Sequence, residues 1–469
     1  MSVEREIELT EQEGTIVNWQ AYGLKEFSLD IPPTVYPPRE DTQLLDRTLA
    51  ELKCPKGTSL LEIGCGSGAV AIAAALRGWD VSACDVNPLA IAATIGNAAK
   101  VGIQWGAAIR EGGPGDIGDW ASKRGVDVIA WNLPYMEPDS GPTLGPLEDS
   151  ALIGQGESEK LLNAITENPV LLNSGGVVLM LHSSNRIGDE LSRNWRKAGW
   201  ATRNVSEAIV GDERLTVIAC WRPFEHAPVI RLESCKSTND EVLKMKNSPQ
   251  GTLVSTEKQD SGRGYAGREW ENSPDGFMGS WILDKNSIER GPENIQLASN
   301  LAILDTISVF TDHGLPSHSW IHGSALEACG IRVKWPNDVW LRTQEKIGKM
   351  CGILVEGRTQ GEDVQFVLGI GMNRTSISEL TESSGWSELF SESVEEVIPV
   401  IHASVASLLE VHPMINDYDS EAVLSSIFSS MRMTMSEGFP QSFGLDDLSG
   451  LRTRGGIVRT TGQIEWKWD

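Results

Sequence analysis

Short apolar runs alternate with helical stretches through the first half of the chain. The apolar runs SLLEI (59–63), VDVIAWN (126–132) and GVVLMLHS (176–183) have the length of strands. Between such runs, AVAIAAALRG (69–78) and NRIGDELSRNWRKAGW (185–200) have the length and composition of helices. Strand and helix in regular alternation predict an α/β fold with a doubly wound, Rossmann-like parallel sheet.

The alternation stops at RPFEHAP (222–228), where two prolines precede a new apolar strand, VIRLES (229–234). We therefore expect a first domain over 1–224. The second unit mixes strands and helices, which predicts an α+β domain over 225–415. Strand-and-turn residues near the end of the chain, LRTRGGIVRTTGQIEWKWD, predict a small C-terminal β-module over 416–469.

Composition restricts the possible functions. A formal net charge of −25 over 469 residues repels polyphosphate at long range and argues against binding to DNA or RNA. No apolar run approaches the roughly 20 residues that span a bilayer, and the N-terminus lacks the pattern of a signal peptide, so we expect a cytoplasmic protein without membrane contact. The seven cysteines and seven histidines show no metal-ligand spacing, and we expect no metal site built from protein ligands.

A glycine-rich turn, LLEIGCGSGAV (60–70), joins a predicted strand to a predicted helix. Gly64, Gly66 and Gly68 allow tight turning and close approach of a ligand to the backbone. Asp85 ends the next strand, where a carboxylate can bind both hydroxyls of a ribose. Glu62, before the first glycine, suits the methionine end of S-adenosylmethionine better than a dinucleotide. This combination resembles class I methyltransferases, and a dehydrogenase is the less favoured alternative.

The sequence WNLPY (131–135) indicates the methyl acceptor. The side-chain oxygen of Asn132 and the carbonyl of Leu133 can accept the two N–H bonds of a planar amide or exocyclic amine. Pro134 shapes the turn, and Tyr135 can stack on the face of such a group and align its nitrogen with the methyl donor. Two acceptors fit, namely glutamine in a protein and adenine in a nucleic acid.

The upstream segment TVYPPREDTQLL (34–45) resembles the corresponding segment of the archaeal and eukaryotic HemK-like family. The resemblance covers about residues 30–222 and implies methylation of a glutamine in a translation termination factor. Leu133 stands where the family usually has a second proline, a form more frequent in ribosomal RNA adenine methyltransferases. Adenine therefore stays open as the alternative acceptor.

Five ordered motifs in the second half resemble those of biotin protein ligases. They are KSTNDEV (236–242), TEKQDSGRGYAGREW (256–270), VKWPNDVW (333–340), KMCGILVE (349–356) and GIGMN (369–373). The resemblance covers about residues 225–469 and implies activation of biotin by ATP with Mg²⁺. It also implies transfer of biotin to a lysine of a carboxylase biotin carrier domain. A lipoate ligase is less favoured, because the second and third motifs are not expected there.

The resemblance implies a role for each polar motif residue. Ser237, Thr238 and Gln259 would hold the ureido ring, and Asn239, Gly352 and Tyr265 would complete the ligand site. Gly262 and Gly264 would bring backbone N–H groups to the phosphate, whose charge Arg263 would neutralise. Lys349 would bridge the biotin carboxylate and the phosphate, and Trp270 would exclude water. Asp338 would orient the incoming lysine amine, with Asn337 and Asn373 as supporting contacts.

The two resemblances together predict a fusion of two enzymes. Two residues complicate the assignment of ligase roles. Tyr265 stands where many family members have an arginine that retains the adenylate, and Lys346 competes with Lys349 for the catalytic position. The non-enzymatic alternative is that one half is an inactive docking module.

Overall fold

The structure is a computed structural model of the chain, and contacts divide it into two compact units. The first unit contains Met1–Trp195, Thr202–Trp221 and His412–Asn416, and the second contains Arg196–Ala201, Arg222–Val411 and Asp417–Asp469. The structure describes residues 14–116, 118–134, 156–183, 186–245, 247–264, 268–284, 291–311, 330–344, 346–360, 363–377, 380, 382–417, 423, 427–428, 442–446, 450–453 and 456–458.

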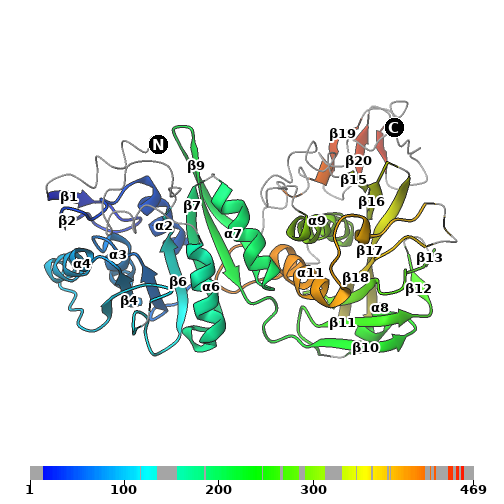
Figure 1. The fold of residues 1–469 in the computed structure, drawn as a ribbon, viewed down its shortest axis with the longest axis horizontal. Coiled ribbons are helices and arrows are strands. Elements are labelled where there is room, and N and C mark those ends of the chain that lie inside the picture. Colours follow the sequence, from blue (N-terminus) through cyan, green and yellow to red (C-terminus); the bar gives the residue numbers. More distant parts are fainter. Residues whose placement is uncertain are drawn as a thin grey trace. The chain divides into compact units, whose positions relative to one another are not determined.

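The first unit is built on a seven-stranded sheet with the order β5-β4-β3-β6-β7-β9-β8 (Figure 1). The central pairs β4–β5, β3–β4, β3–β6 and β6–β7 are parallel, whereas β7 and β9 are antiparallel. The strands are β3 (Ser59–Ile63), β4 (Asp80–Asp85), β5 (Ile109–Glu111), β6 (Val126–Asn132), β7 (Leu172–Ser183), β8 (Ala201–Val210) and β9 (Glu213–Trp221).

This sheet has the predicted Rossmann-like fold, but it is mixed and not entirely parallel, because β9 runs antiparallel to β7, and its two edge strands β5 and β8 were not predicted from the sequence. The strand β8 was not predictable from an apolar run, because its TRNVSEAIV stretch alternates polar and apolar residues and its second half is only partly buried, with Glu207 and Ile209 exposed. A strand at the edge of a sheet needs no continuous apolar run, since only part of its surface is covered.

Local signals start the helices that flank the glycine-rich turn. The helix α3 (Ala69–Leu76) begins after Gly68, which has the left-handed φ of 83°. The helix α4 (Pro88–Lys100) begins at Asn87, whose side chain accepts a hydrogen bond from the Leu89 N–H. The remaining elements of this unit are α2 (Glu40–Glu51), α6 (Glu157–Glu167), α7 (Arg186–Lys197), the 3₁₀ turn Pro169–Leu171 and the antiparallel pair β1 (Thr15–Trp19) and β2 (Phe27–Ile31).

The second unit contains a seven-stranded, mostly antiparallel sheet with the order β10-β11-β14-β18-β17-β16-β15. Only its edge pair β10–β11 is parallel among the described strands. The strands are β10 (Val229–Cys235), β11 (Leu253–Gln259), β14 (Phe277–Ile282), β15 (Ile331–Lys334), β16 (Asp338–Arg342), β17 (Ile347–Gln360) and β18 (Asp363–Met372).

Three helices among the described residues accompany this sheet. The long helices α9 (Pro292–Phe310) and α11 (Val394–Leu409) pack against each other, and α8 (Thr238–Lys244) packs on β11, β14 and β18 (Figure 1). The smaller elements are the pair β12 (Gly262–Arg263) and β13 (Glu269–Trp270), the 3₁₀ turn Trp386–Glu388 and the three-stranded sheet β19 (Ser442–Leu445), β20 (Leu451–Thr453) and β21 (Gly456–Val458). Sheet and helices together form the predicted α+β arrangement.

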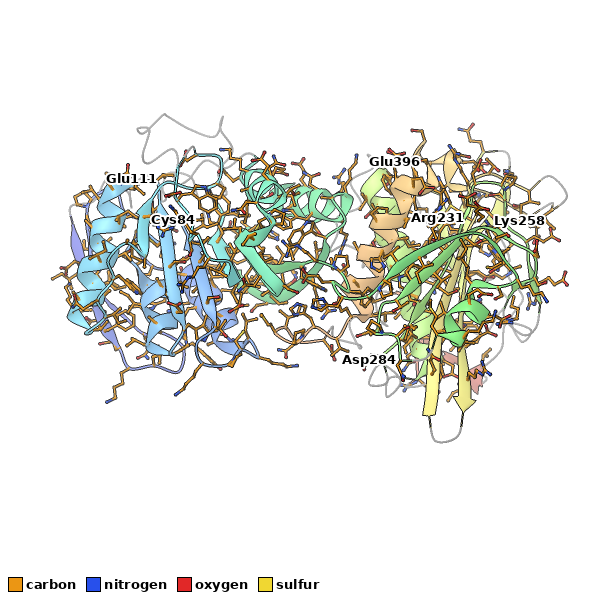
Figure 2. All side chains as sticks on the ribbon, turned by 90° about the horizontal axis from the view of Figure 1, so that it is seen from below. Cys84, Glu111, Arg231, Lys258, Asp284 and Glu396 are labelled. Atoms are coloured by element: carbon orange, nitrogen blue, oxygen red, sulfur yellow. The ribbon has the colours of Figure 1, made fainter. Side chains whose placement is uncertain are left out.

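Each unit has its own buried side chains. Cys84 on β4 lies inside the first unit, whereas Lys258 on β11 projects from the second unit into solvent (Figure 2). Among the described helices, none has the combination of length and apolar composition that crossing a bilayer would require.

Candidate functional site

The glycine-rich turn after β3 wraps around the end of β4. Gly64, Gly66 and Gly68 have φ values of 70°, 53° and 83°, in the left-handed region that favours glycine. The Gly66 N–H donates a hydrogen bond to Asp85 Oδ2 over 2.9 Å, and the Asn87 N–H donates to Asp85 Oδ1 over 2.9 Å. Each carboxylate oxygen can accept a second bond, so Asp85 is fixed in place and still able to bind hydroxyl groups.

Two carboxyl groups lie beside this turn, and burial affects both of them. Glu62 on β3 is 5% exposed, and its Oε2 has no hydrogen-bond partner among the described residues. Burial raises the pKa of Glu62 well above its ordinary value, and burial also raises the pKa of Asp85. A buried carboxyl group with an unpaired oxygen is suited to a ligand that brings positive charge.

A cavity of about 350 Å³ connects these groups with the end of β6. It is lined by Glu62, Gly64, Gly66, Asp85, Asn132, Leu133 and Pro134, whereas Gly68 does not line it and serves to start α3. The sequence analysis missed Asp116, which also lines the cavity and accepts a hydrogen bond from the Gly113 N–H. The signal was the EGGPGD segment after β5, because turns after parallel strands form the ligand edge of such sheets.

Asn132 ends β6 at the rim of this cavity. Its Nδ2 donates a hydrogen bond to Asp41 Oδ2 over 2.9 Å, while its buried Oδ1 has no partner among the described residues. The Leu133 N–H is bonded to the Leu181 carbonyl, which fixes the turn beside Pro134. Tyr135 lies outside the described residues.

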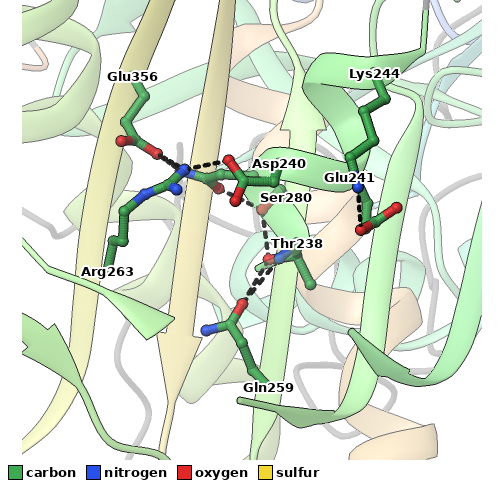
Figure 3. Close-up of polar contacts among 9 residues, drawn as sticks. Thr238, Asp240, Glu241, Lys244, Gln259, Arg263, Ser280 and Glu356 are labelled. Atoms are coloured by element: carbon green, nitrogen blue, oxygen red, sulfur yellow. Dashed lines mark hydrogen bonds and ion pairs between the residues drawn. The ribbon is translucent and has the colours of Figure 1, made fainter. Parts of the chain in front are cut away.

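In the second unit, polar side chains from α8, β11 and β14 meet (Figure 3). Gln259 Oε1 accepts hydrogen bonds from the Thr238 N–H over 2.9 Å and from Thr238 Oγ1 over 3.3 Å. The Ser280 hydroxyl lies 2.7 Å from Thr238 Oγ1 and 2.5 Å from Asn239 Oδ1. Ser237, Thr238 and Asn239 are all buried. This cluster offers donors and acceptors in fixed positions, as a neutral polar ring would require.

Arg263 of the glycine-rich loop is held by two carboxylates (Figure 3). Its Nη2 lies 2.9 Å from Asp240 Oδ1 and 2.9 Å from Glu356 Oε2. These carboxylates raise the pKa of Arg263, with the hydrogen bond to Asp240 as the largest contribution. Glu356 also accepts a hydrogen bond from Asn239 Nδ2. The sequence analysis did not identify Asp240 or Glu356, although both stand inside its motifs.

Lys349 and Trp270 meet over two glycines of the sheet. The Lys349 ammonium lies 4.9 Å from the centre of the Trp270 ring and 2.7 Å from Asp338 Oδ1. A Cβ atom at Gly352 would lie 2.7 Å from the Trp270 ring, and one at Gly371 would lie 2.4 Å from Trp270 Nε1. Glycine at both positions therefore lets the indole lie close to β17 and β18.

The competing lysine lies elsewhere. The Lys346 ammonium contacts the Ser376 hydroxyl and the Ser383 carbonyl, and it lies 3.4 Å from Glu388 Oε1. Lys349 lines the cavity beside Trp270, whereas Lys346 is not among the residues that line it. The geometry thus favours Lys349 as the lysine that can reach a ligand.

The cavity at this second site has a volume of about 40 Å³. Of the predicted residues, it is lined by Ser237, Thr238, Asn239, Gln259, Arg263, Gly264, Trp270, Asn337, Lys349 and Gly352. Gly262, Asp338 and Asn373 do not line it, and Tyr265 lies outside the described residues. Ligand pockets usually enclose about 300–1,000 Å³, so the cavity formed by the described residues is smaller than a typical ligand pocket.

Two predicted asparagines support the backbone around this cavity. Asn337 Nδ2 donates to the Ile353 carbonyl over 2.9 Å, and Asn373 Oδ1 accepts from the Ser273 N–H over 3.0 Å. These contacts tie neighbouring loops to β17 and β18. Within the described parts of the chain, no group of three or more His, Cys, Asp or Glu side chains is placed to hold a metal ion.

Comparison with known families finds a separate match in each unit. Residues 229–373 match the biotin/lipoate A/B protein ligase family, and residues 42–133 match the ribosomal protein L11 methyltransferase (PrmA) family. The first match includes the motifs that line the smaller cavity. The second includes the glycine-rich turn, Asp85 and Asn132.

Individual relatives divide along the chain in the same way. A Methanocaldococcus jannaschii protein described as a candidate protein N5-glutamine methyltransferase is 30% identical over 198 residues, which cover 41% of this chain and 95% of that protein. The release factor glutamine methyltransferase of Salmonella typhimurium is 29% identical over 41% of this chain and 72% of its own length.

The ligase relatives found by sequence are matched over a smaller part of their length than the methyltransferase relatives. The biotin–[acetyl-CoA-carboxylase] ligase of Paracoccus denitrificans is 32% identical over 29% of this chain and 50% of its own length. Among solved structures, the biotin protein ligase from Aquifex aeolicus in complex with biotin and ATP is 22% identical, with a TM-score of 0.35, over 51% of this chain and 99% of that one.

Proposed function

We propose that the chain is a bifunctional enzyme, because its N-terminal region belongs to the HemK/PrmA-like methyltransferases and its C-terminal half carries a biotin protein ligase domain. The proposed domains are a methyltransferase over 1–224, a ligase catalytic domain over 225–415 and a small C-terminal module of the ligase over 416–469. Each activity has its own site.

We propose that the ligase half joins biotin to a lysine of a biotin carboxyl carrier domain. In the first step, a carboxylate oxygen of biotin attacks the α-phosphorus of Mg-bound ATP, and the bond to the leaving pyrophosphate breaks. In the second step, the lysine amine attacks the acyl carbon, loses a proton and displaces AMP. The observation that carries this proposal is that Lys349, Trp270 and the Thr238–Gln259 pair line one cavity, although they come from separate motifs.

The charges around this cavity fit the proposed chemistry. The Lys349 ammonium would stabilise negative charge that develops between carboxylate and phosphate. Asp338 lies 2.7 Å from that ammonium. Once Lys349 turns toward the phosphate, Asp338 would be able to accept a hydrogen bond from the incoming lysine amine. Arg263 would have to exchange Asp240 and Glu356 for the phosphate, so nucleotide binding and loop rearrangement are coupled.

We propose that the methyltransferase half modifies a planar nitrogen, with the glutamine side chain of a translation termination factor as the acceptor. S-adenosylmethionine supplies an electrophilic methyl group when bound. The residues fit that cofactor because the buried Glu62, whose Oε2 has no partner among the described residues, can meet its positively charged methionine end and Asp85 can accept from ribose hydroxyls. The unpaired Oδ1 of Asn132 would accept an N–H of the acceptor and align its nitrogen.

Mass spectrometry of candidate acceptors tests both activities. A carboxylase carrier domain incubated with biotin, ATP and the protein is expected to gain one biotin. A termination factor incubated with S-adenosylmethionine is expected to gain one methyl group on glutamine. Leu133 keeps adenine as a second acceptor, so an adenine-containing oligonucleotide belongs in the same assay. If only one of the two halves modifies an acceptor, the half without activity is an inactive docking module.

Replacing Glu62 by glutamine is expected to remove the pH dependence of cofactor binding. Burial raises the pKa of Glu62 well above its ordinary value, so the free protein favours the protonated carboxyl group more than an exposed glutamate would. A cationic ligand favours the carboxylate, so binding releases a proton and affinity rises as pH rises toward the pKa of the free protein. Calorimetry in buffers of different ionisation enthalpy measures this proton. Equal proton release by the wild-type protein and the Glu62→Gln variant would contradict the expectation.

Replacing Tyr265 by arginine is expected to slow the release of the biotinyl adenylate about ten- to a hundred-fold, because a charge-assisted hydrogen bond contributes about 1.5–3 kcal/mol. The alternative is that Arg268 or Lys258 reaches the phosphate and Tyr265 only stacks. Lys258 is 74% exposed and lies 3.2 Å from Asp260 (Figure 2). Stopped-flow measurement of adenylate dissociation gives the rates, and Tyr265→Phe controls for loss of the hydroxyl. Identical off-rates for wild type and the arginine variant would refute the hypothesis.

A further inference from the structure

Asn132 makes a hydrogen bond that the acceptor chemistry does not use. Its Nδ2 donates to Asp41 Oδ2 over 2.9 Å, from the first turn of α2. Asp41 is far from Asn132 in the sequence and is 3% exposed. On the other side of the same amide, the buried Oδ1 has no hydrogen-bond partner among the described residues. The Nδ2 end of the amide therefore has a hydrogen-bond acceptor beside it, whereas the Oδ1 end has no partner among the described residues.

This asymmetry matters because the two ends of an asparagine amide have nearly the same shape and opposite chemistry. The nitrogen only donates and the oxygen only accepts. An ionised carboxylate only accepts, so it can pair with Nδ2 and not with Oδ1. A nitrogen that carries hydrogens, in an amide or an exocyclic amine, needs the acceptor end of Asn132. If the amide rotated by half a turn, Nδ2 would face those hydrogens and repel them.

The Asp41 carboxylate is itself fixed. Its Oδ1 accepts a hydrogen bond from the Thr42 N–H over 2.6 Å and lies 3.1 Å from Thr42 Oγ1. The helix that carries it is anchored by the buried side chains of Leu44, Leu45 and Leu49. Thr42 lines the cavity, whereas Asp41 lies behind Asn132 and does not. Asp41 therefore contacts the cavity through Asn132, with which it shares a hydrogen bond.

We propose that Asp41 is a positioning residue for methyl transfer, which holds the Asn132 amide with its oxygen available to the acceptor nitrogen. The role rests on the proposed methyltransferase function, and it applies to both glutamine and adenine because both present N–H groups. Asp41, the aspartate of the PPREDT segment, would thus have a positioning role in addition to its place in the first turn of α2. The predicted consequence is a loss of turnover without a loss of cofactor binding.

The first test does not depend on the methyl acceptor. The full chain is labelled with ¹⁵N-asparagine, and hydrogen exchange of the Asn132 side-chain NH₂ is followed by NMR in the wild type and in Asp41→Asn, with the signal assigned by its absence in Asn132→Ala. The Asp41→Asn variant preserves shape but replaces a carboxylate, which only accepts, by a neutral amide that can present either its oxygen or its NH₂ to Asn132, so the charge-assisted hydrogen bond is lost. Exchange is expected to accelerate about ten-fold or more, the equivalent of one charge-assisted hydrogen bond. An unchanged exchange rate would overturn the proposal.

The second test measures kcat, the KM for the acceptor and cofactor affinity in the same variant. We expect kcat to fall about ten-fold while cofactor affinity stays constant. Asp46→Asn is the matched control, because Asp46 is buried on the same helix and pairs with Arg77 over 2.6 Å, away from Asn132. This control is expected to lower the melting temperature and to keep kcat.

These outcomes separate the inference from the function on which it rests. Equal losses of kcat in Asp41→Asn and Asp46→Asn would reduce Asp41 to a structural residue and overturn the proposal, and so would an unchanged kcat in Asp41→Asn. If the wild-type protein methylates neither glutamine nor adenine, the proposed function fails, while the exchange measurement still decides whether Asp41 holds the amide.

Discussion

Replacing Lys349 by alanine is expected to slow biotinyl-adenylate formation about 10²–10³-fold, the usual effect of removing one group that stabilises transition-state charge. The physical reason is that the Lys349 ammonium is the lysine charge lining the described cavity, where it lies over the Trp270 ring. Biotin-dependent release of pyrophosphate from ATP measures this step directly. Transfer to the carrier domain from preformed biotinyl adenylate should be affected less.

Lys346→Ala is the matched control for this prediction. Lys346 lies three residues earlier and contacts Ser376 and the Ser383 carbonyl, so its loss should affect local stability more than catalysis. Methyl transfer by the Lys349→Ala variant should equal that of the wild type. The assignment is wrong if pyrophosphate release survives in Lys349→Ala and is lost in Lys346→Ala.

Replacing Asn132 by alanine is expected to reduce methyl transfer about 10²–10³-fold, because the acceptor nitrogen loses the contact that aligns it in the transition state. Cofactor affinity should change little, since the turn around Gly66 and Asp85 is built from other residues. Transfer of a labelled methyl group to the termination factor measures the rate, and calorimetry measures cofactor binding.

Asp85→Asn should show the reverse pattern and so serves as the comparison. Asp85 accepts from the Gly66 and Asn87 N–H groups, and its replacement should weaken cofactor binding more than it slows the methyl transfer of the saturated enzyme. Both variants should biotinylate a carrier domain at the wild-type rate. A collapse of cofactor affinity in Asn132→Ala would show that Asn132 does not address the acceptor.

The main strands of the first unit and its glycine-rich turn could be predicted from the sequence alone. The apolar runs at 59–63, 126–132 and 176–183 all became strands of one sheet, because burial on both faces requires a continuous apolar run. The glycine-rich turn was equally readable, since left-handed φ values at Gly64 and Gly66 restrict the residue type strongly. Such features depend on neighbours within a few residues of the chain.

The pairs of polar groups that form across the fold could not be predicted from the sequence, because they depend on how distant segments pack. Two of these pairings join segments that are distant in the sequence: Asn132 contacts Asp41, and Arg263 contacts both Asp240 and Glu356. The position of Lys346 outside the cavity likewise depends on how the strands pack. The edge strand β8 was missed for a related reason, because its partly polar sequence becomes a strand through pairing with the sheet. The residue type shows which hydrogen bonds and ion pairs a side chain can make. Its actual partner depends on which distant segments come together when the chain folds.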